Sequence, residues 1–173
     1  MTLFAKFFKK NKVSQEQINR HFVFIEAPKD CVVHAALLWG EGDWWPKDSL
    51  AQFQRQTNGG LQVGAQYLLT VGKPLNIKFL LEVTKYDPQK FVERTFKSGM
   101  IVGCEWTKVE ERSNGTRVDY ELQYKIKGLF SKVLWNLFLK KLHENNIKTI
   151  LACLKNHCLQ TYQAQEQKKF NQG

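Results

Sequence analysis

The strongest constraint on the fold is a strict alternation of apolar and polar residues, which is followed directly by the pattern of a long apolar helix. In residues 117–127 every second side chain is apolar, namely Val118, Tyr120, Leu122, Tyr124 and Ile126. A period of two is typical of a strand with one buried face. Residues 61–71 and 77–83 alternate in the same way. The sequence therefore predicts a group of strands that bury one common face.

Turn signals separate these strands and predict how they connect. The turns are Gly72-Lys73-Pro74, Asp87-Pro88, Ser98-Gly99 and Asn114-Gly115. The Asn-Gly pair is the strongest hairpin signal, because both residues tolerate a positive φ. We therefore expect an antiparallel meander. Upstream we predict a strand at 21–26, a helix that begins at Pro28 and ends near Gly40, a loop at Trp44-Trp45-Pro46 and a short helix at 47–55.

After Gly128 the apolar spacing changes to three and four residues. The apolar positions are Val133, Leu134, Leu137, Phe138, Ile147, Ile150, Leu151, Leu154 and Cys158. This spacing predicts a helix of about thirty residues over 130–160, with a kink near Asn145-Asn146. The first half also carries Trp135 and Leu139, which is more apolar surface than one sheet covers. We expect this half to face a cavity, a membrane or another subunit.

The chain divides into three segments. Residues 1–18 form a basic amphipathic extension, because Leu3, Phe4, Phe7 and Phe8 share one face of a helix. Residues 19–160 form one domain, and a length of 173 residues is enough for a core and an enclosed cavity. Residues 161–173 form a polar tail rich in Gln and Lys, which we expect to be disordered or frayed.

The net charge of +10 is concentrated at the two ends of the chain. Residues 1–20 carry five basic side chains and one acidic one, and residues 128–173 carry seven and two. Such asymmetry favours an anionic partner, a membrane surface or nucleic acid, although lysines on solvated helix faces explain it equally well. The apolar runs are too short for a membrane span. The four cysteines lack paired spacing, which favours reduced thiols and a cytoplasmic protein, with peripheral membrane association as an extension.

The order of elements resembles the START-like helix-grip (SRPBCC) superfamily, which includes polyketide cyclases and lipid-transfer domains. The resemblance covers about residues 20–160 and depends on the motifs Glu26-Ala27-Pro28, Trp44-Trp45-Pro46, Glu82-Val83-Thr84, Asp87-Pro88, Gly115-Thr116-Arg117-Val118 and Gly128. It implies an α+β fold in which a curved antiparallel sheet is wrapped around a long C-terminal helix. It also implies a deep, mostly apolar pocket between them.

The alternating faces identify candidate ligand-binding residues. They are Tyr67, Leu69, Phe79, Leu81, Met100, Trp106, Tyr120, Leu122, Tyr124, Leu134, Leu137 and Phe138, with Val71, Cys104, Val118 and Leu151 completing the walls. Apolar walls with a few hydroxyls suit a lipid, an isoprenoid, a sterol or a polyaromatic ligand, whose polar end the tyrosines would orient. The alternative is that these residues fill a solid core.

No catalytic constellation is evident. The four histidines have no metal-ligand spacing, and no Ser or Cys lies in a nucleophile motif, so we predict no catalytic residue, no metal site and no cofactor. The orientation of Arg94 is ambiguous, because Phe91, Val92 and Phe96 do not alternate cleanly. An isolated tyrosine is a poor base near neutral pH, which argues against an enzyme.

The favoured function is therefore a carrier or sensor of a small hydrophobic ligand that passes between an anionic membrane and the cavity. Two alternatives stay open: an enzyme of the cyclase or aromatase type, and a quinone-binding, chaperone-like interaction module. We do not expect nucleic-acid binding, because no nucleic-acid-binding signature accompanies the basic charge. The sequence does not fix the oligomeric state.

Overall fold

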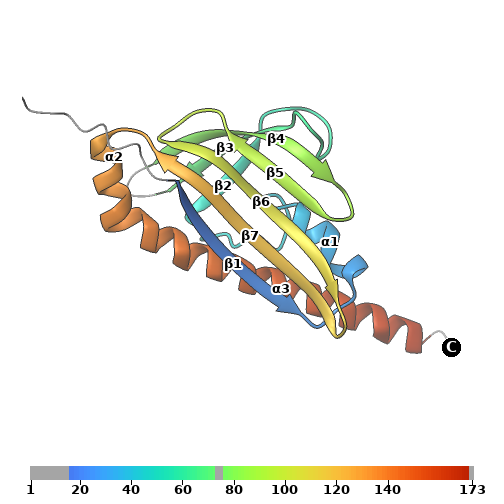
Figure 1. The fold of residues 1–173 in the computed structure, drawn as a ribbon. Coiled ribbons are helices and arrows are strands. Elements are labelled where there is room, and N and C mark those ends of the chain that lie inside the picture. Colours follow the sequence, from blue (N-terminus) through green and yellow to red (C-terminus); the bar gives the residue numbers. More distant parts are fainter. Residues whose placement is uncertain (1–15, 73–75, 172–173) are drawn as a thin grey trace, which may run out of the picture.

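The computed structural model describes residues 16–72 and 76–171, in which one antiparallel sheet packs against a long helix (Figure 1). The strands are β1 (Gln17–Ile25), β2 (Ala51–Arg55), β3 (Gln66–Val71), β4 (Ile77–Asp87), β5 (Phe91–Phe96), β6 (Ile101–Arg112) and β7 (Gly115–Ile126). The helical segments are α1 (Lys29–Leu37), α2 (Leu129–Leu134), η1 (Trp135–Leu139) and α3 (Lys140–Phe170). The predicted fold class, a curved sheet around a long C-terminal helix, is confirmed.

The strand order in the sheet is β1-β7-β6-β5-β4-β3-β2, and all neighbours are antiparallel. Strands β2 to β7 thus form the predicted meander, and β1 joins it beside β7. The hairpin between β6 and β7 pairs Arg112 with Gly115. Its register places Val109 opposite Val118, Thr107 opposite Tyr120 and Glu105 opposite Leu122, which decides which residues of β6 face the helix.

The C-terminal helix is continuous through α2, η1 and α3, and α2 lies at an angle to α3 (Figure 1). The turn η1 is a π-helix, which adds one residue to a turn. Its buried residues Trp135 and Leu139 are four residues apart, and so are Leu139 and His143. Each interval is slightly longer than the 3.6 residues of one α-helical turn. The extra residue keeps these side chains on one face.

Two predictions for this helix are wrong. Its irregular turn is at η1, whereas Asn145 and Asn146, where we expected a kink, lie inside α3. The segment expected to be disordered or frayed is helical as far as Phe170, and Cys31 Sγ donates a hydrogen bond to Gln165 Oε1 (3.3 Å). The helix therefore extends about ten residues beyond its expected end.

Two predictions upstream also need correction. The short helix expected at 47–55 is the edge strand β2, because Ala51, Phe53 and Arg55 alternate with exposed glutamines and pair with β3. The strand expected from Leu61 begins at Gln66, after a turn region. The predicted first strand and first helix are confirmed as β1 and α1. Most of the basic segment 1–18 lies outside the described residues, and β1 already begins at Gln17.

A tryptophan cluster fixes the chain between α1 and β2 over the sheet. The ring of Trp39 stacks on Tyr120 of β7, with centroids 4.9 Å apart and planes at 12°. Trp44 and Trp45 pack edge-on against Trp39, and their indole N–H groups donate to the backbone carbonyls of Ala35 and Ala51. This cluster forms one wall of the space between sheet and helix.

Candidate functional site

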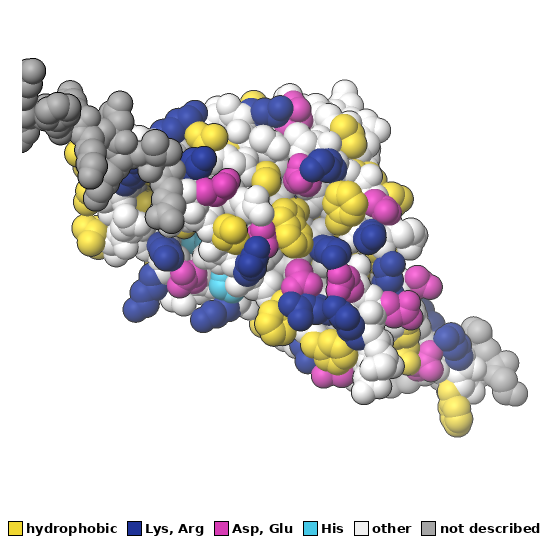
Figure 2. Space-filling view, viewed as in Figure 1, with side chains coloured by type: hydrophobic (Ala, Val, Ile, Leu, Met, Phe, Trp, Pro, Cys, Tyr) yellow, Lys and Arg dark blue, Asp and Glu magenta, His cyan; other side chains and the backbone are white. Residues whose placement is uncertain are grey.

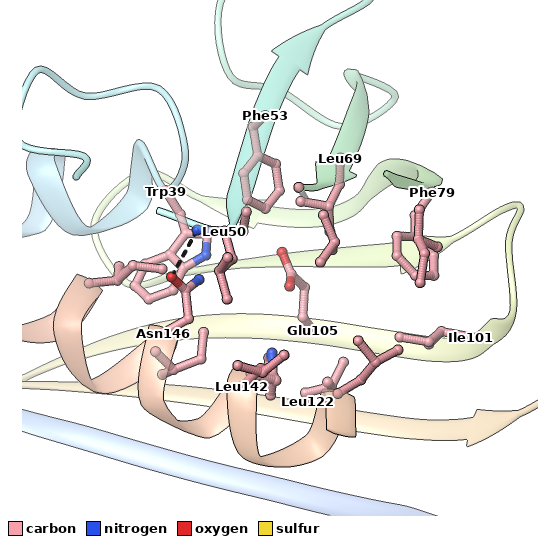
Figure 3. Close-up of a pocket in the computed structure, with 18 of the residues that line it drawn as sticks. Trp39, Leu50, Phe53, Leu69, Phe79, Ile101, Glu105, Leu122, Leu142 and Asn146 are labelled. Carbon is pink, nitrogen blue, oxygen red and sulfur yellow. Dashed lines mark hydrogen bonds between the residues drawn. The ribbon is translucent and has the colours of Figure 1, made fainter. Parts of the chain in front are cut away.

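A cavity of about 90 Å³ lies between the sheet, the tryptophan cluster and the C-terminal helix. Its walls are almost entirely apolar. The main apolar residues are Trp39, Trp45, Phe53, Leu69, Phe79, Phe96, Ile101 and Leu122 on the sheet side and Trp135, Leu139, Leu142, Ile147 and Ile150 on the helix. Polar groups come from Glu105, Tyr120, His143 and Asn146. Figure 3 shows Glu105 projecting from the sheet between Phe53, Leu69 and the helix.

The volume is small for a ligand site. Pockets for drug-sized ligands usually measure ~300 Å³ or more, whereas this cavity measures about 90 Å³. A cavity of ~150 Å³ holds a benzene molecule. The space therefore admits a compact molecule only if neighbouring side chains move.

Glu105 is the one acidic side chain in the lining among the residues that the structure describes, and it is buried. Its Oε2 accepts a hydrogen bond from the Tyr120 hydroxyl at 3.0 Å, and its Oε1 lies 3.7 Å from Arg94 Nη1. Burial raises the pKa of the Glu105 carboxyl, although the charge of Arg94 and the Tyr120 hydrogen bond oppose this shift. The carboxyl is thus more readily protonated than an ordinary glutamate.

Arg94 points inward, which resolves its ambiguous orientation, and it lies behind Glu105. Its side chain has no exposed surface, and its Nη2 donates to the carbonyl oxygens of Leu37 (3.4 Å) and Trp39 (3.3 Å). The guanidinium also lies over the Tyr67 ring, 5.4 Å from its centroid. These contacts tie β5 to the C-terminal end of α1 and to the chain just after it, and they hold Glu105 between Arg94 and Tyr120.

His143 of α3 provides the second titratable group. Burial, followed by the charge of His21, lowers the pKa of His143 to about 4, so the imidazole is neutral near pH 7. Its ring lies 6.2 Å from the Tyr120 ring and 6.0 Å from the Trp135 ring, measured between centroids. Its Nε2 is buried without a hydrogen-bond partner among the described residues.

The predicted site residues divide into three groups. Leu69, Phe79, Tyr120 and Leu122 line the cavity. Tyr67, Leu81 and Tyr124 are buried and Leu134 is half-buried, but these four are not in the lining. Met100, Trp106, Leu137 and Phe138 are outside it as well, and Leu137 and Phe138 are exposed. The role of all these residues in binding stays a prediction.

The predicted tyrosine hydroxyls already have partners within the protein. Tyr67 donates to Glu41 Oε1 (2.7 Å), and burial and this hydrogen bond raise its pKa to about 12. Tyr124 donates to Gln17 Oε1 and accepts from the indole N–H of Trp135, both at 2.9 Å. The Tyr120 hydroxyl donates a hydrogen bond to Glu105 Oε2. These hydroxyls therefore organise the protein around the cavity.

On β6 the prediction placed the wrong face inward. Cys104 and Trp106 were expected in the wall, but Ile101, Glu105, Thr107 and Val109 are the buried residues. Large apolar residues such as Trp106 are usually buried, which is why we expected this face to point inward. The hairpin at Asn114-Gly115 carried the correct signal, because its register pairs the inward residues of β7 with the odd-numbered residues of β6.

The first turns of the C-terminal helix carry exposed apolar side chains. We call this set the α2/η1 patch: Leu129, Phe130, Val133, Leu137, Phe138 and Leu142, which are 43% to 81% exposed. Residues 127–143 include Lys127, Lys132, Lys140 and Lys141 and no acidic residue. Figure 2 shows hydrophobic side chains at the α2 end of the molecule with basic side chains nearby. Leu142 belongs both to the patch and to the cavity wall.

Two further properties concern metal sites and membrane spans. Within the described residues, no group of three or more His, Cys, Asp and Glu side chains is placed to hold a metal ion. No helix of this part of the chain combines the length and the apolar character that crossing a bilayer needs.

The fold is similar to several solved structures at low sequence identity. A protein from Thermus thermophilus is 18% identical, with a TM-score of 0.65 over 83% of this chain and 97% of that one. A norcoclaurine synthase point mutant from Thalictrum, in complex with a transition-state analogue, is 12% identical, with a TM-score of 0.62 over 84% and 96%. Ginseng major latex-like protein 151 from Panax ginseng is 12% identical, with a TM-score of 0.61 over 83% and 98%. No family model and no curated protein sequence matches the chain.

Proposed function

Because the chain has the helix-grip fold of the START-like superfamily, we propose that it binds a compact, mostly apolar small molecule between the sheet and the C-terminal helix. The observation that carries this proposal is an apolar cavity that contains a buried carboxyl, Glu105, whose Oε1 accepts no hydrogen bond from the described residues and has only the more distant Arg94 guanidinium, 3.7 Å away. A buried oxygen that lacks a hydrogen bond lowers stability, and a ligand that supplies this bond offsets the cost.

Entry of the molecule requires the cavity to widen, and η1 is the segment best suited to move. A π-helical turn interrupts the regular hydrogen bonding of a helix and is common at functional sites. Trp135 and Leu139 of this turn line the cavity, whereas Leu137 and Phe138 on its other side are exposed. A shift of η1 away from the sheet would enlarge the space without unfolding the sheet.

The direct test is mass spectrometry of organic extracts of the purified protein, with a variant that fills the cavity. Ala51 lines the cavity, so Ala51→Met should reduce the amount of any co-purified small molecule. Ala35→Met is the matched control, because Ala35 packs on the core but is not in the lining. Equal amounts in the two variants would contradict binding in this cavity.

A second candidate function is acid–base catalysis on the bound molecule, which Glu105 favours. A carboxyl whose pKa is raised by burial can exchange a proton with a ligand nearer to neutral pH than an ordinary glutamate can. Glu105→Gln removes the proton exchange but keeps the shape. Loss of turnover of a candidate substrate with binding retained would favour the enzyme, whereas unchanged turnover would exclude Glu105 as its acid or base.

We also propose that the α2/η1 patch docks on anionic membranes. Apolar side chains that project among lysines combine insertion into the interface with attraction to anionic lipids, and each lysine near the surface contributes roughly 1 kcal/mol. Because Leu142 connects the patch with the cavity wall, docking there would bring the cavity next to the bilayer. A ligand could then pass between the two without crossing water.

Vesicle co-sedimentation tests the docking with matched variants. Lys140→Gln with Lys141→Gln should weaken binding to anionic vesicles, whereas Lys168→Gln with Lys169→Gln, near the other end of the helix, should not. Phe138→Ser should weaken it more than Phe170→Ser, although Phe170 is the more exposed of the two. Binding should also fall as salt rises. Equal binding to neutral and anionic vesicles would contradict electrostatic docking.

A further inference from the structure

Two buried polar atoms at the cavity have no hydrogen-bond partner among the described residues: Glu105 Oε1 and His143 Nε2. Two other polar atoms of the wall already form hydrogen bonds. Asn146 Oδ1 accepts from Ser49 Oγ (3.2 Å) and from the backbone N–H of Leu50 (3.1 Å), and the Tyr120 hydroxyl donates to Glu105 Oε2. The buried polar atoms of this wall that lack a hydrogen bond thus belong to a carboxyl and an imidazole.

The two groups come from opposite walls. Glu105 belongs to β6 and His143 to α3, and Tyr120 contacts both, since it donates to the carboxyl and its ring lies 6.2 Å from the imidazole ring. Trp39 stacks on Tyr120, which fixes the position of that ring. The unpartnered atoms are therefore held by a packed aromatic framework.

We propose that Glu105 and His143 together bind one neutral hydroxyl group of the apolar ligand. This inference rests on the proposed function and names the polar group of the molecule bound. A hydroxyl both donates and accepts hydrogen bonds. At Glu105 it can donate to a carboxylate or accept from a carboxylic acid. At His143 it can donate to an unprotonated Nε2 or accept from a protonated Nε2, depending on the tautomer of the neutral imidazole.

Charge excludes the two ionic alternatives. An ammonium ligand would have to share the Glu105 carboxyl with Arg94, whose guanidinium lies 3.7 Å behind it. A carboxylate ligand would meet Glu105, and no lysine or arginine of residues 16–72 and 76–171 lies in the lining. Because burial keeps His143 neutral near pH 7, it offers no positive charge to an anion. A neutral alcohol or phenol is the class that satisfies both atoms without adding a charge.

The experiment compares four probes of one size: cyclohexanol, cyclohexylamine, cyclohexanecarboxylate and cyclohexane. None of them absorbs with the indole rings, so the fluorescence of Trp39, Trp45 and Trp135, which line the cavity, can follow binding. Cyclohexanol should bind about tenfold more tightly than each of the other three. If cyclohexane binds as tightly as cyclohexanol, the hydroxyl site is refuted and the apolar cavity stands. If no probe gives a saturable signal, both proposals fail.

Variants then assign the preference to the two residues. His143→Phe keeps an aromatic ring but removes the nitrogen, so the preference for cyclohexanol over cyclohexane should fall several-fold while cyclohexane binding persists. His157→Phe, on the same helix outside the lining, is its control. Glu105→Gln should reduce the same preference, with Glu121→Gln as the control, since Glu121 is equally buried but is not in the lining. An unchanged preference in His143→Phe and Glu105→Gln would overturn the assignment.

Discussion

Arg94 and Glu105 are cross-strand partners in β5 and β6, and their side chains form a buried ion pair, with Nη1 3.7 Å from Oε1. Neither residue has meaningful exposure, at 0% and 3%. Removing one member of such a pair leaves an uncompensated buried charge, which is far more costly than losing a pair at the surface. The pair therefore supports the cavity wall as well as supplying its carboxyl.

We predict that Arg94→Met lowers the free energy of unfolding by about 3–5 kcal/mol, because Glu105 loses its counter-charge. The double variant Arg94→Met with Glu105→Gln should lose less than the sum of the two single variants. Urea unfolding of the four proteins gives this coupling energy. Lys169→Met is the control, because Lys169 and Glu166 form a pair in which both side chains are exposed, and its loss should have little effect. Additive losses would show that the pair is not coupled.

The second prediction concerns stability at acid pH. Burial lowers the pKa of His143 from 6.5 to about 4. Between these values the unfolded chain binds a proton that the folded protein does not, so stability falls as the pH drops from about 6.5 to about 4. The loss attributable to His143 is on the order of 3 kcal/mol once the pH is below about 4.

The variant His143→Phe isolates this effect when unfolding is measured at several pH values. Its stability should fall less steeply below pH 6.5 than that of the wild type. The stability of His143→Phe should still fall somewhat as the pH drops, because burial also lowers the pKa of His21. Glu105 acts in the opposite direction, since its raised pKa lets the folded state take up a proton before the unfolded chain does. Identical pH dependence in the two proteins would contradict the neutral state of His143 in the folded protein.

The sequence was most informative where local pattern and tertiary role agree. In β4 and β7 the alternation of apolar residues predicted the buried faces, including Phe79 and Leu122 of the cavity wall. The Asn-Gly turn predicted the hairpin between β6 and β7. These features depend on periodicity and turn chemistry, which are properties of short segments.

The pattern left the orientation of β5 open, was wrong on β6, and was wrong for a related reason on the first turns of the helix. Both strands direct charged residues inward, Arg94 and Glu105, which compensate each other in a way that a binary pattern cannot represent. On the helix, the π-turn η1 adds a residue, so Trp135 and Leu139 face the cavity while Leu137 and Phe138 are exposed. Local rules are expected to fail at functional or strained sites. Here their failures coincide with the residues that distinguish the cavity from a plain core.

The last prediction concerns Gly103, which precedes Glu105 on β6 by one strand period and is paired with Tyr124. Its φ of +146° is rarely adopted by residues that have a side chain. A Cβ atom there would also overlap the backbone carbonyl of Gln123 on the neighbouring strand, so the two strands would have to separate. Gly103→Ala should therefore lower the free energy of unfolding by at least about 2 kcal/mol. It should also weaken binding of the cavity probes, because Glu105 follows on the same strand.

Gly60→Ala is the control for Gly103→Ala. A Cβ atom at Gly60 would have open space, so the free energy of unfolding should change by less than about 0.5 kcal/mol. Denaturant unfolding of both variants decides the matter, and a Gly103→Ala protein as stable as Gly60→Ala would mean that β6 and β7 adopt a different local geometry.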